Sequence, residues 1–169
     1  MNIAQLNQQF AIPNTVKFIE GQGGLPFIQV QTDKAQALIS VYAGQVLSFK
    51  PINQDADLMF LSTKAYYQAG KAIKGGVPIC WPWFGADPEG KGRPAHGFVR
   101  NRMWEVIETH LGPEGEVAVT LGLNDTPETQ AIWPYSFQLR LVVTIGDTLK
   151  LALITHNTGD QAFTITQAF

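Results

Sequence analysis

The chain has 169 residues, 45% of them hydrophobic, with 12 Lys and Arg against 14 Asp and Glu. This length suffices for a single domain with a real core, and the apolar content excludes a disordered chain. An isoelectric point near 5.9 argues against a general nucleic-acid binder. The single cysteine, Cys80, excludes an internal disulfide and suits a reducing compartment.

The N-terminus, MNIAQLNQQF, has no basic region followed by an apolar run, so no signal peptide is predicted. No apolar stretch approaches the ~20 residues that span a membrane. The sequence shows no internal repeat and no interdomain linker. We therefore expect one domain over residues 1–169, in the cytoplasm, with neither a membrane nor a nucleic acid as partner.

Apolar and polar residues alternate with a period of two over most of the chain, which predicts half-buried antiparallel strands. Residues 1–12 are predicted as a short amphipathic turn with Leu6 and Phe10 inward, and residues 127–132 as the one helix, with Thr126 as N-cap. The sequence thus predicts an all-β fold, an antiparallel β-sandwich. Its expected strands are residues 16–20, 26–32, 35–41, 45–50, 104–109, 116–123, 135–145, 149–157 and 163–169.

The segment from residue 70 to residue 104 has the composition of a ligand site. It holds seven of the 16 glycines, four of the 10 prolines and three of the four tryptophans. Glycine permits close backbone approach and positive φ, and proline fixes turns. Six of the 12 basic residues fall here against two carboxylates, a local excess of +4 in a chain of net charge −2.

Basic residues and one histidine are the first candidates in this segment. Lys74, followed by two glycines, predicts an anion cradle made of backbone N–H groups and an ammonium, and Arg100 suits a two-pronged contact with a phosphate. Solvated surface charge is the alternative for both. His96 suits a contact with a hydroxyl group or a proton transfer, with a loop histidine bonded to a carbonyl as the equal alternative. His110 and His156 are weaker candidates, and the three histidines lack metal-ligand spacing, so no metal site is predicted.

Aromatic side chains suggest a sugar-binding face. Trp81, Trp83 and Phe84 could stack on the C–H face of a sugar ring, although core packing is the better expectation for at least one of the two indoles. Cys80 is expected to be an inert buried thiol.

Two carboxylates, Asp87 and Glu89, flank Pro88 in this segment. They allow a catalytic pair, but turn chemistry is the stronger expectation.

Three stretches of this segment, AIKGGVP (residues 72–78), CWPWFG (residues 80–85) and PAHGFVRN (residues 94–101), closely resemble the hexose-6-phosphate mutarotases. These enzymes, also called glucose-6-phosphate 1-epimerases, belong to the aldose 1-epimerase group. The resemblance covers essentially the whole chain. It implies a galactose-mutarotase-like β-supersandwich and a cytoplasmic isomerase that needs no metal or other cofactor.

By this resemblance, Lys74 and Arg100 match basic residues that contact the phosphosugar, and His96 lies in the substrate pocket. Trp83 is counted with them as a substrate-binding candidate because its ring could stack on the sugar. The family usually has arginine where this chain has Lys74, and lysine lacks the planar fork for bidentate phosphate binding. Ala95, before His96, offers no side-chain hydrogen bond.

The resemblance also bears on the end of the chain, FTITQAF (residues 163–169). In such enzymes this strand is followed by a His-Thr-Tyr-Phe motif with the acid, and a glutamate base comes much later. We therefore expect no catalytic residue within this chain, with acid and base beyond Phe169. Residues 1–169 should resemble only the N-terminal part of the enzyme and neither catalyse mutarotation nor fold as a fully stable monomer, whereas the complete protein should be monomeric.

The residues themselves also allow two functions other than that of an enzyme. A non-catalytic carbohydrate-binding β-sandwich would use the same tryptophans and basic residues without acid or base. A purely structural β-domain is the weaker of the two.

Overall fold

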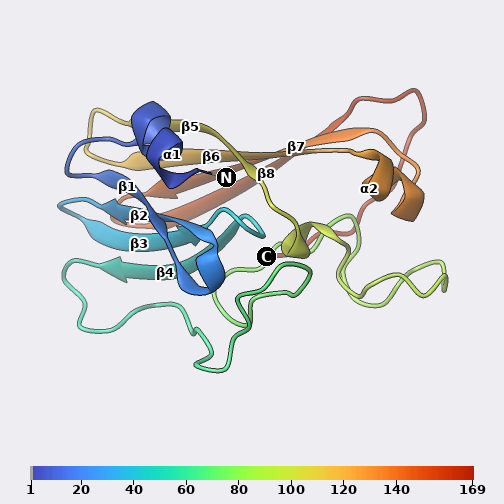
Figure 1. Ribbon diagram of the computed structural model, residues 1–169, viewed down its shortest axis with the longest axis horizontal. Coiled ribbons are helices and arrows are strands. Elements are labelled where there is room, and N and C mark those ends of the chain that lie inside the picture. The colour runs from blue at the N-terminus through green and yellow to red at the C-terminus, as the bar shows by residue number, and fades with distance from the viewer. Residues whose placement is uncertain (1) are drawn as a thin grey trace.

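The computed structural model describes residues 2–169. Two four-stranded antiparallel sheets, in the orders β1-β2-β3-β4 and β5-β6-β7-β8, make up the body of the chain (Figure 1). The strands are β1 (Val16–Glu20), β2 (Pro26–Gln31), β3 (Ala35–Ser40), β4 (Gln45–Pro51), β5 (Glu105–Leu111), β6 (Val117–Asn124), β7 (Phe137–Ile145) and β8 (Leu149–Asn157). The helices are α1 (Ile3–Phe10) and α2 (Pro127–Ile132), with short 3-10 turns at Gln22–Gly24 and Val99–Asn101.

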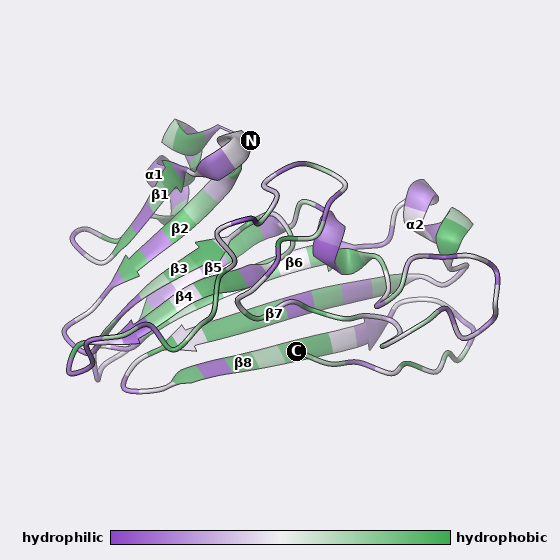
Figure 2. Cartoon of the chain, turned by 90° about the horizontal axis from the view of Figure 1, so that it is seen from below, coloured by the Kyte–Doolittle hydropathy of each residue, from purple (hydrophilic) through white to green (hydrophobic). Residues whose placement is uncertain are grey.

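The two sheets share one hydrophobic core. Inward side chains of the first sheet, such as Ile28 and Ile39, belong to the same buried cluster as Leu121 and Leu141 of the second. Along β7 the buried and half-buried positions alternate without a break. Figure 2 shows this strand as mostly hydrophobic, with hydrophilic bands between hydrophobic ones over part of its length. The alternation in the sequence therefore records which side of each strand faces the core.

A smaller cluster covers the opposite side of the first sheet. Leu25, Phe27, Tyr42 and Leu47 pack there with Ile73 and with side chains of the long segment between β4 and β5. This packing attaches the beginning of the irregular region to the sheet.

The helix α1 packs against the edge strands β1 and β5, and α2 connects β6 to β7. In α1, Leu6 is buried, and Asn7 exchanges two hydrogen bonds with the backbone of Phe18 in β1. In α2, Thr126 and Thr129 form a reciprocal capping pair. Trp133, which follows α2, is buried in the shared core. No helix among residues 2–169 is long and apolar enough to cross a membrane.

The predicted all-β, antiparallel sandwich is confirmed. The predicted strand over residues 163–169 is wrong: this segment forms only one isolated bridge, between Ala168 and Cys80. The Thr166 N–H donates to the Pro82 carbonyl, but proline has no N–H to return, and the Phe84 N–H donates to the Thr166 hydroxyl instead. Regular pairing therefore stops there.

Candidate functional site

Residues 79–104 form an irregular segment built around a buried aromatic cluster. Trp81 is fully buried and lies 5.9, 5.1 and 4.5 Å, between ring centroids, from Phe98, Trp133 and Phe137. Trp104 is also fully buried and donates its indole N–H to the Val99 carbonyl. These contacts give the loops on the segment a rigid base, and they place Trp81 in the core rather than in a binding face.

Trp83 is buried as well, with 3% of its surface exposed. The Arg93 guanidinium lies 4.4 Å from the centroid of its ring, and its indole N–H donates to the Pro94 carbonyl at 3.0 Å. Trp83 therefore supports the loop above it, with one ring face already occupied. The aromatic side chain that does reach the surface is Phe84, which is 58% exposed.

His96 is held by its neighbour in space, Gly85. The His96 N–H donates to the Gly85 carbonyl at 2.7 Å, and the Gly85 N–H donates to Nδ1 of the imidazole at 3.1 Å. Because Nδ1 accepts, a neutral ring carries its proton on Nε2. No group among residues 2–169 bonds to Nε2. His96 is thus half-buried and offers an N–H donor, with the Phe84 ring 5.0 Å away.

Arg100 lies on the same segment. One guanidinium nitrogen donates to the Ala95 carbonyl at 3.1 Å, next to His96 in the chain. Its remaining donors have no partner among the described residues, and the side chain is half-buried. Trp83, His96 and Arg100 are therefore brought together by contacts within residues 83–100.

Ion pairs account for part of the positive charge in the segment. Arg93 pairs with Asp87, Lys91 pairs with Glu89 at 2.6 Å, and Arg102 approaches Glu128 at 3.9 Å. Among the described residues, the three basic residues between positions 70 and 104 that lack a carboxylate partner are Lys71, Lys74 and Arg100.

The carboxylates of Asp87 and Glu89 stabilise the turn in which they lie, which was the stronger expectation from the sequence. Asp87 accepts from the Glu89 N–H at 3.1 Å, and the Arg93 side chain holds the pKa of Asp87 well below its ordinary value. Lys91, followed by Arg93, lowers the pKa of Glu89. Both groups stay ionised near neutral pH and cannot act as general acids there.

Cys80 is buried, as expected. Burial raises the pKa of its thiol, and the positive charge of Arg100 opposes this only in part. The thiol therefore stays protonated and inert.

Lys74 is exposed and lies on a different loop. Its carbonyl accepts from the Ser62 N–H, and no contact joins its side chain to His96 or Arg100 among residues 2–169. The Gly76 N–H does not contribute to the predicted anion cradle in this structure, because it donates to the Phe60 carbonyl at 2.7 Å. A Cβ on Gly76 would lie 2.1 Å from the Val46 carbonyl oxygen, so this glycine is required for packing against β4.

A cavity of about 330 Å³ lies beside the segment, on the side of residues 162–166. Trp133, Tyr135 and Phe163 form its aromatic wall, with ring centroids 4.6 to 5.6 Å apart. Glu89 and Arg93 supply its charged groups. Of the four predicted binding residues, Trp83 lines this cavity, whereas Lys74, His96 and Arg100 do not.

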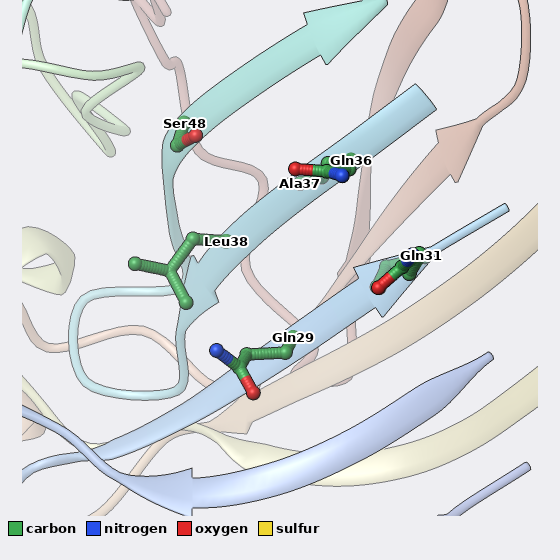
Figure 3. A pocket seen from close by; sticks show the side chains of 7 residues that line it. Gln29, Gln31, Gln36, Ala37, Leu38 and Ser48 are labelled. Atoms are coloured by element: carbon green, nitrogen blue, oxygen red, sulfur yellow. The ribbon is translucent and has the colours of Figure 1, made fainter. Parts of the chain in front are cut away.

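A second hollow, of about 260 Å³, lies on the outer face of the first sheet (Figure 3). Gln29 and Gln31 of β2, Gln36 of β3 and Ser48 of β4 line it with uncharged polar groups. No candidate binding residue belongs to it.

Sequence reasoning missed two side chains that shape the site. Gln45 is fully buried and donates to the carbonyls of Ile73 and Gly75, on either side of Lys74. A glutamine within the apolar run VYAGQVLSF was the available signal. Thr166 had no such signal, because its partner Phe84 lies 82 positions away.

Metal ligation finds no support in side-chain clustering. The residues that the structure describes contain no group of three or more His, Cys, Asp and Glu side chains that could hold a metal ion. His110 on β5 and His156 on β8 are both exposed, as expected of surface residues.

Comparison with known proteins identifies relatives. The family model for aldose 1-epimerase matches residues 26–169. A protein of Escherichia coli (strain K12) named "Putative glucose-6-phosphate 1-epimerase" is 36% identical over 132 residues, which cover 78% of this chain and 44% of that protein. The chain thus spans less than half the length of this curated relative.

Solved structures agree with this match. A "putative mutarotase" from Salmonella typhimurium superposes with a TM-score of 0.80 at 29% identity, over 87% of this chain and 48% of that one. A galactose mutarotase-like protein from Clostridium acetobutylicum superposes with a TM-score of 0.66 at 15% identity, over 85% and 49% of the two chains, and shares the fold.

Proposed function

Since the chain belongs to the aldose 1-epimerase family, we propose that it forms the N-terminal part of a hexose-6-phosphate 1-epimerase. Such an enzyme interconverts the α and β anomers of a hexose 6-phosphate. The observation that carries the proposal is the position of Arg100. This cation has no carboxylate partner among residues 2–169, and it donates a hydrogen bond to the Ala95 carbonyl, in the loop that bears the His96 donor. The relative from Escherichia coli bears a name of the same activity.

The proposed reaction is an acid–base opening and closing of the sugar ring. An acid protonates the ring oxygen while a base removes the proton of the anomeric hydroxyl, so the ring opens to the aldehyde. Rotation about the C1–C2 bond and closure on the other face give the second anomer. Proton transfer of this kind contributes ~10²–10⁴-fold to the rate. We propose that acid and base belong to the part of the family fold that this chain does not span.

The residues of this chain would bind and orient the substrate. Arg100 and Lys74 would hold the phosphate, and the Nε2–H of His96 would donate to a sugar hydroxyl. Remote binding energy of this kind can be directed to orientation of the reacting ring. A cytoplasmic location and a monomeric state remain predictions from the sequence.

Binding of phosphorylated and plain sugar to the protein of the full coding sequence tests the phosphate site. Charged hydrogen bonds contribute about 1.5–3 kcal/mol each, so glucose 6-phosphate should bind at least about tenfold more tightly than glucose. Arg100→Ala should remove most of this preference in calorimetric titrations. Lys91→Ala, which also removes one positive charge from the segment, should leave it intact. Equal affinities in the unaltered protein would refute the phosphate site.

Polarimetry tests the chemistry. Freshly dissolved α-glucose 6-phosphate should relax faster than in buffer alone when the full-length protein is added. His96→Ala should weaken binding yet leave measurable mutarotation, because the imidazole is proposed as a hydrogen-bond donor and not as the acid. A complete loss with His96→Ala would reverse that role.

The aromatic cavity beside residues 162–166 supports the second candidate, a carbohydrate-binding module without catalysis. Its wall of Trp133, Tyr135 and Phe163 has the chemistry that stacks on sugar rings. Sugar binding without any relaxation above the buffer rate would decide for this candidate.

A further inference from the structure

The two ends of the loop of residues 85–96 meet at a non-glycine residue with a left-handed backbone conformation. His96 has φ 64°, in the left-handed region that non-glycine residues rarely occupy. Such a conformation is strained and persists only when the surroundings impose it. The two hydrogen bonds between His96 and Gly85 are its direct restraints.

Inside this loop lies a concealed ion pair. The Asp87 carboxylate accepts from the Arg93 backbone N–H at 3.1 Å, from Nε at 2.9 Å and from a terminal guanidinium nitrogen at 2.5 Å. The side chains are only 6% and 8% exposed, although the loop is at the surface. Charged residues are seldom buried to this degree unless they are paired.

Arg93 also joins the loop to the rigid core. Its guanidinium covers the Trp83 ring at 4.4 Å and donates to the Ile132 carbonyl at 3.4 Å, at the end of α2. The Trp83 indole N–H in turn holds the Pro94 carbonyl, two residues before His96. The chain of contacts from Asp87 through Arg93 and Trp83 therefore ends beside the imidazole.

We propose that Asp87 and Arg93 are positioning residues for His96. Their ion pair folds the loop over Trp83 so that Gly85 meets the imidazole, and Nδ1 is kept as the acceptor while Nε2–H is kept as the donor to the sugar. That the Nε2–H donates to a sugar rests on the proposed function, whereas the control of the imidazole tautomer does not. In this role both side chains act through the imidazole.

Nitrogen NMR of the imidazole provides a readout that a merely structural role would not move. In the ¹⁵N-labelled full-length protein, long-range ¹H–¹⁵N correlations of His96 should show one neutral tautomer, with the proton on Nε2. Asp87→Asn keeps the size of the side chain but loses the charge, so the spectrum should change to a mixture of tautomers. The matched change Asp55→Asn, at an exposed carboxylate of another loop, should leave the spectrum unchanged.

Ligand affinity provides the second readout. Displacement of a binding group by about 1 Å can cost up to ~10²-fold, so Asp87→Asn should raise KM for glucose 6-phosphate about tenfold and change kcat less. Arg93→Lys, which keeps the charge but loses the fork, should show both effects in weaker form and decides the matter if Asp87→Asn does not fold. If both spectrum and KM stay those of the unaltered protein, the positioning role is overturned. If the tautomer changes while the unaltered protein shows no affinity for the phosphosugar, the proposed function fails and the positioning role stands.

Discussion

The two irregular segments that carry the basic residues, residues 52–76 and residues 79–104, differ in how they are held. No residue between 52 and 72 is buried, and Leu58, Phe60 and Tyr66 are largely exposed. In the second segment Trp81, Val99 and Trp104 are fully buried. Figure 1 shows the first segment looping away from β4 and the second returning towards β5.

The difference teaches that glycine, proline and charge do not by themselves make a rigid site. Beyond the packing of Ile73 on the first sheet, the first segment is held mainly by polar tethers, from the Tyr42 hydroxyl to the Lys71 carbonyl at 2.8 Å and from Gln45 to Gly75. The second is held by packed indole and phenyl rings, which resist displacement more strongly. The backbone that carries Arg100 and His96 is therefore held more rigidly than the backbone that carries Lys74.

The largest effect should come from Gly97→Ala, which would break the rigid segment. A Cβ there would lie 1.8 Å from the Trp81 carbonyl oxygen, and Gly97 has φ +70°. Backbone cannot yield as a side chain can, so we expect a loss of about 4 kcal/mol or more in the free energy of unfolding, measured in urea. Gly92→Ala has a similar φ of +74° and open space, so it should cost only about 1 kcal/mol. Equal losses in the two variants would contradict the packing of this segment.

The next largest effect concerns the stability of the fold at acid pH. Arg93 lowers the pKa of Asp87 in the folded protein. The ion pair therefore stabilises the fold above the unfolded pKa of about 4, and this contribution is lost as pH falls through the lower folded value. Urea midpoints of the unaltered protein and of Asp87→Asn should differ most at neutral pH and converge in acid. Parallel pH curves would show that the ionisation of Asp87 adds no stability.

The regular elements were the predictable part of the fold. Residues 149–157 and 127–132 have the predicted bounds, because alternation and a Thr-Pro helix start are local signals. The strands β2 and β3, predicted over residues 26–32 and 35–41, also followed from local alternation, and they pair as an antiparallel hairpin.

The site was less predictable because its contacts join distant residues. Residues 163–169 alternate as a strand does, yet their partners are residues 80–84, where Pro82 interrupts the pairing. The aromatic motif pointed to a sugar face, but only packing against Arg93 and Phe98 reveals that Trp83 is buried. Counting charges in the sequence showed an excess of positive charge but not which cations are free. The ion pairs of the structure identify basic residues without a carboxylate partner within residues 2–169, and of these Arg100 and Lys74 are the ones that the resemblance had also named.

A moderate effect should come from Gln45→Met, which cuts a tether of the first segment. The change keeps the volume but leaves the carbonyls of Ile73 and Gly75 without their donor. An unpaired buried acceptor costs about 1–3 kcal/mol, so urea unfolding should show a loss of about 2 kcal/mol. Tyr42→Phe removes a single bond to Lys71 and should cost about 1 kcal/mol. A Gln45→Met protein as stable as the original would mean that packing, and not the amide, holds this loop.

The smallest effect should come from Phe60→Ala, compared with the same change in the second segment. Phe60 is 79% exposed, and its carbonyl, which accepts from Gly76, is retained in alanine. Exposed substitutions of this kind stay within about 0.5 kcal/mol. Phe98 is 1% exposed and packs against Trp81 and Trp83, so Phe98→Ala should cost about 3–5 kcal/mol. Urea midpoints of the two variants in the full-length protein measure the contrast directly. A loss above about 1 kcal/mol for Phe60→Ala, beyond the range for exposed sites, would show that another part of the protein covers this ring and that the first segment is as firmly packed as the second.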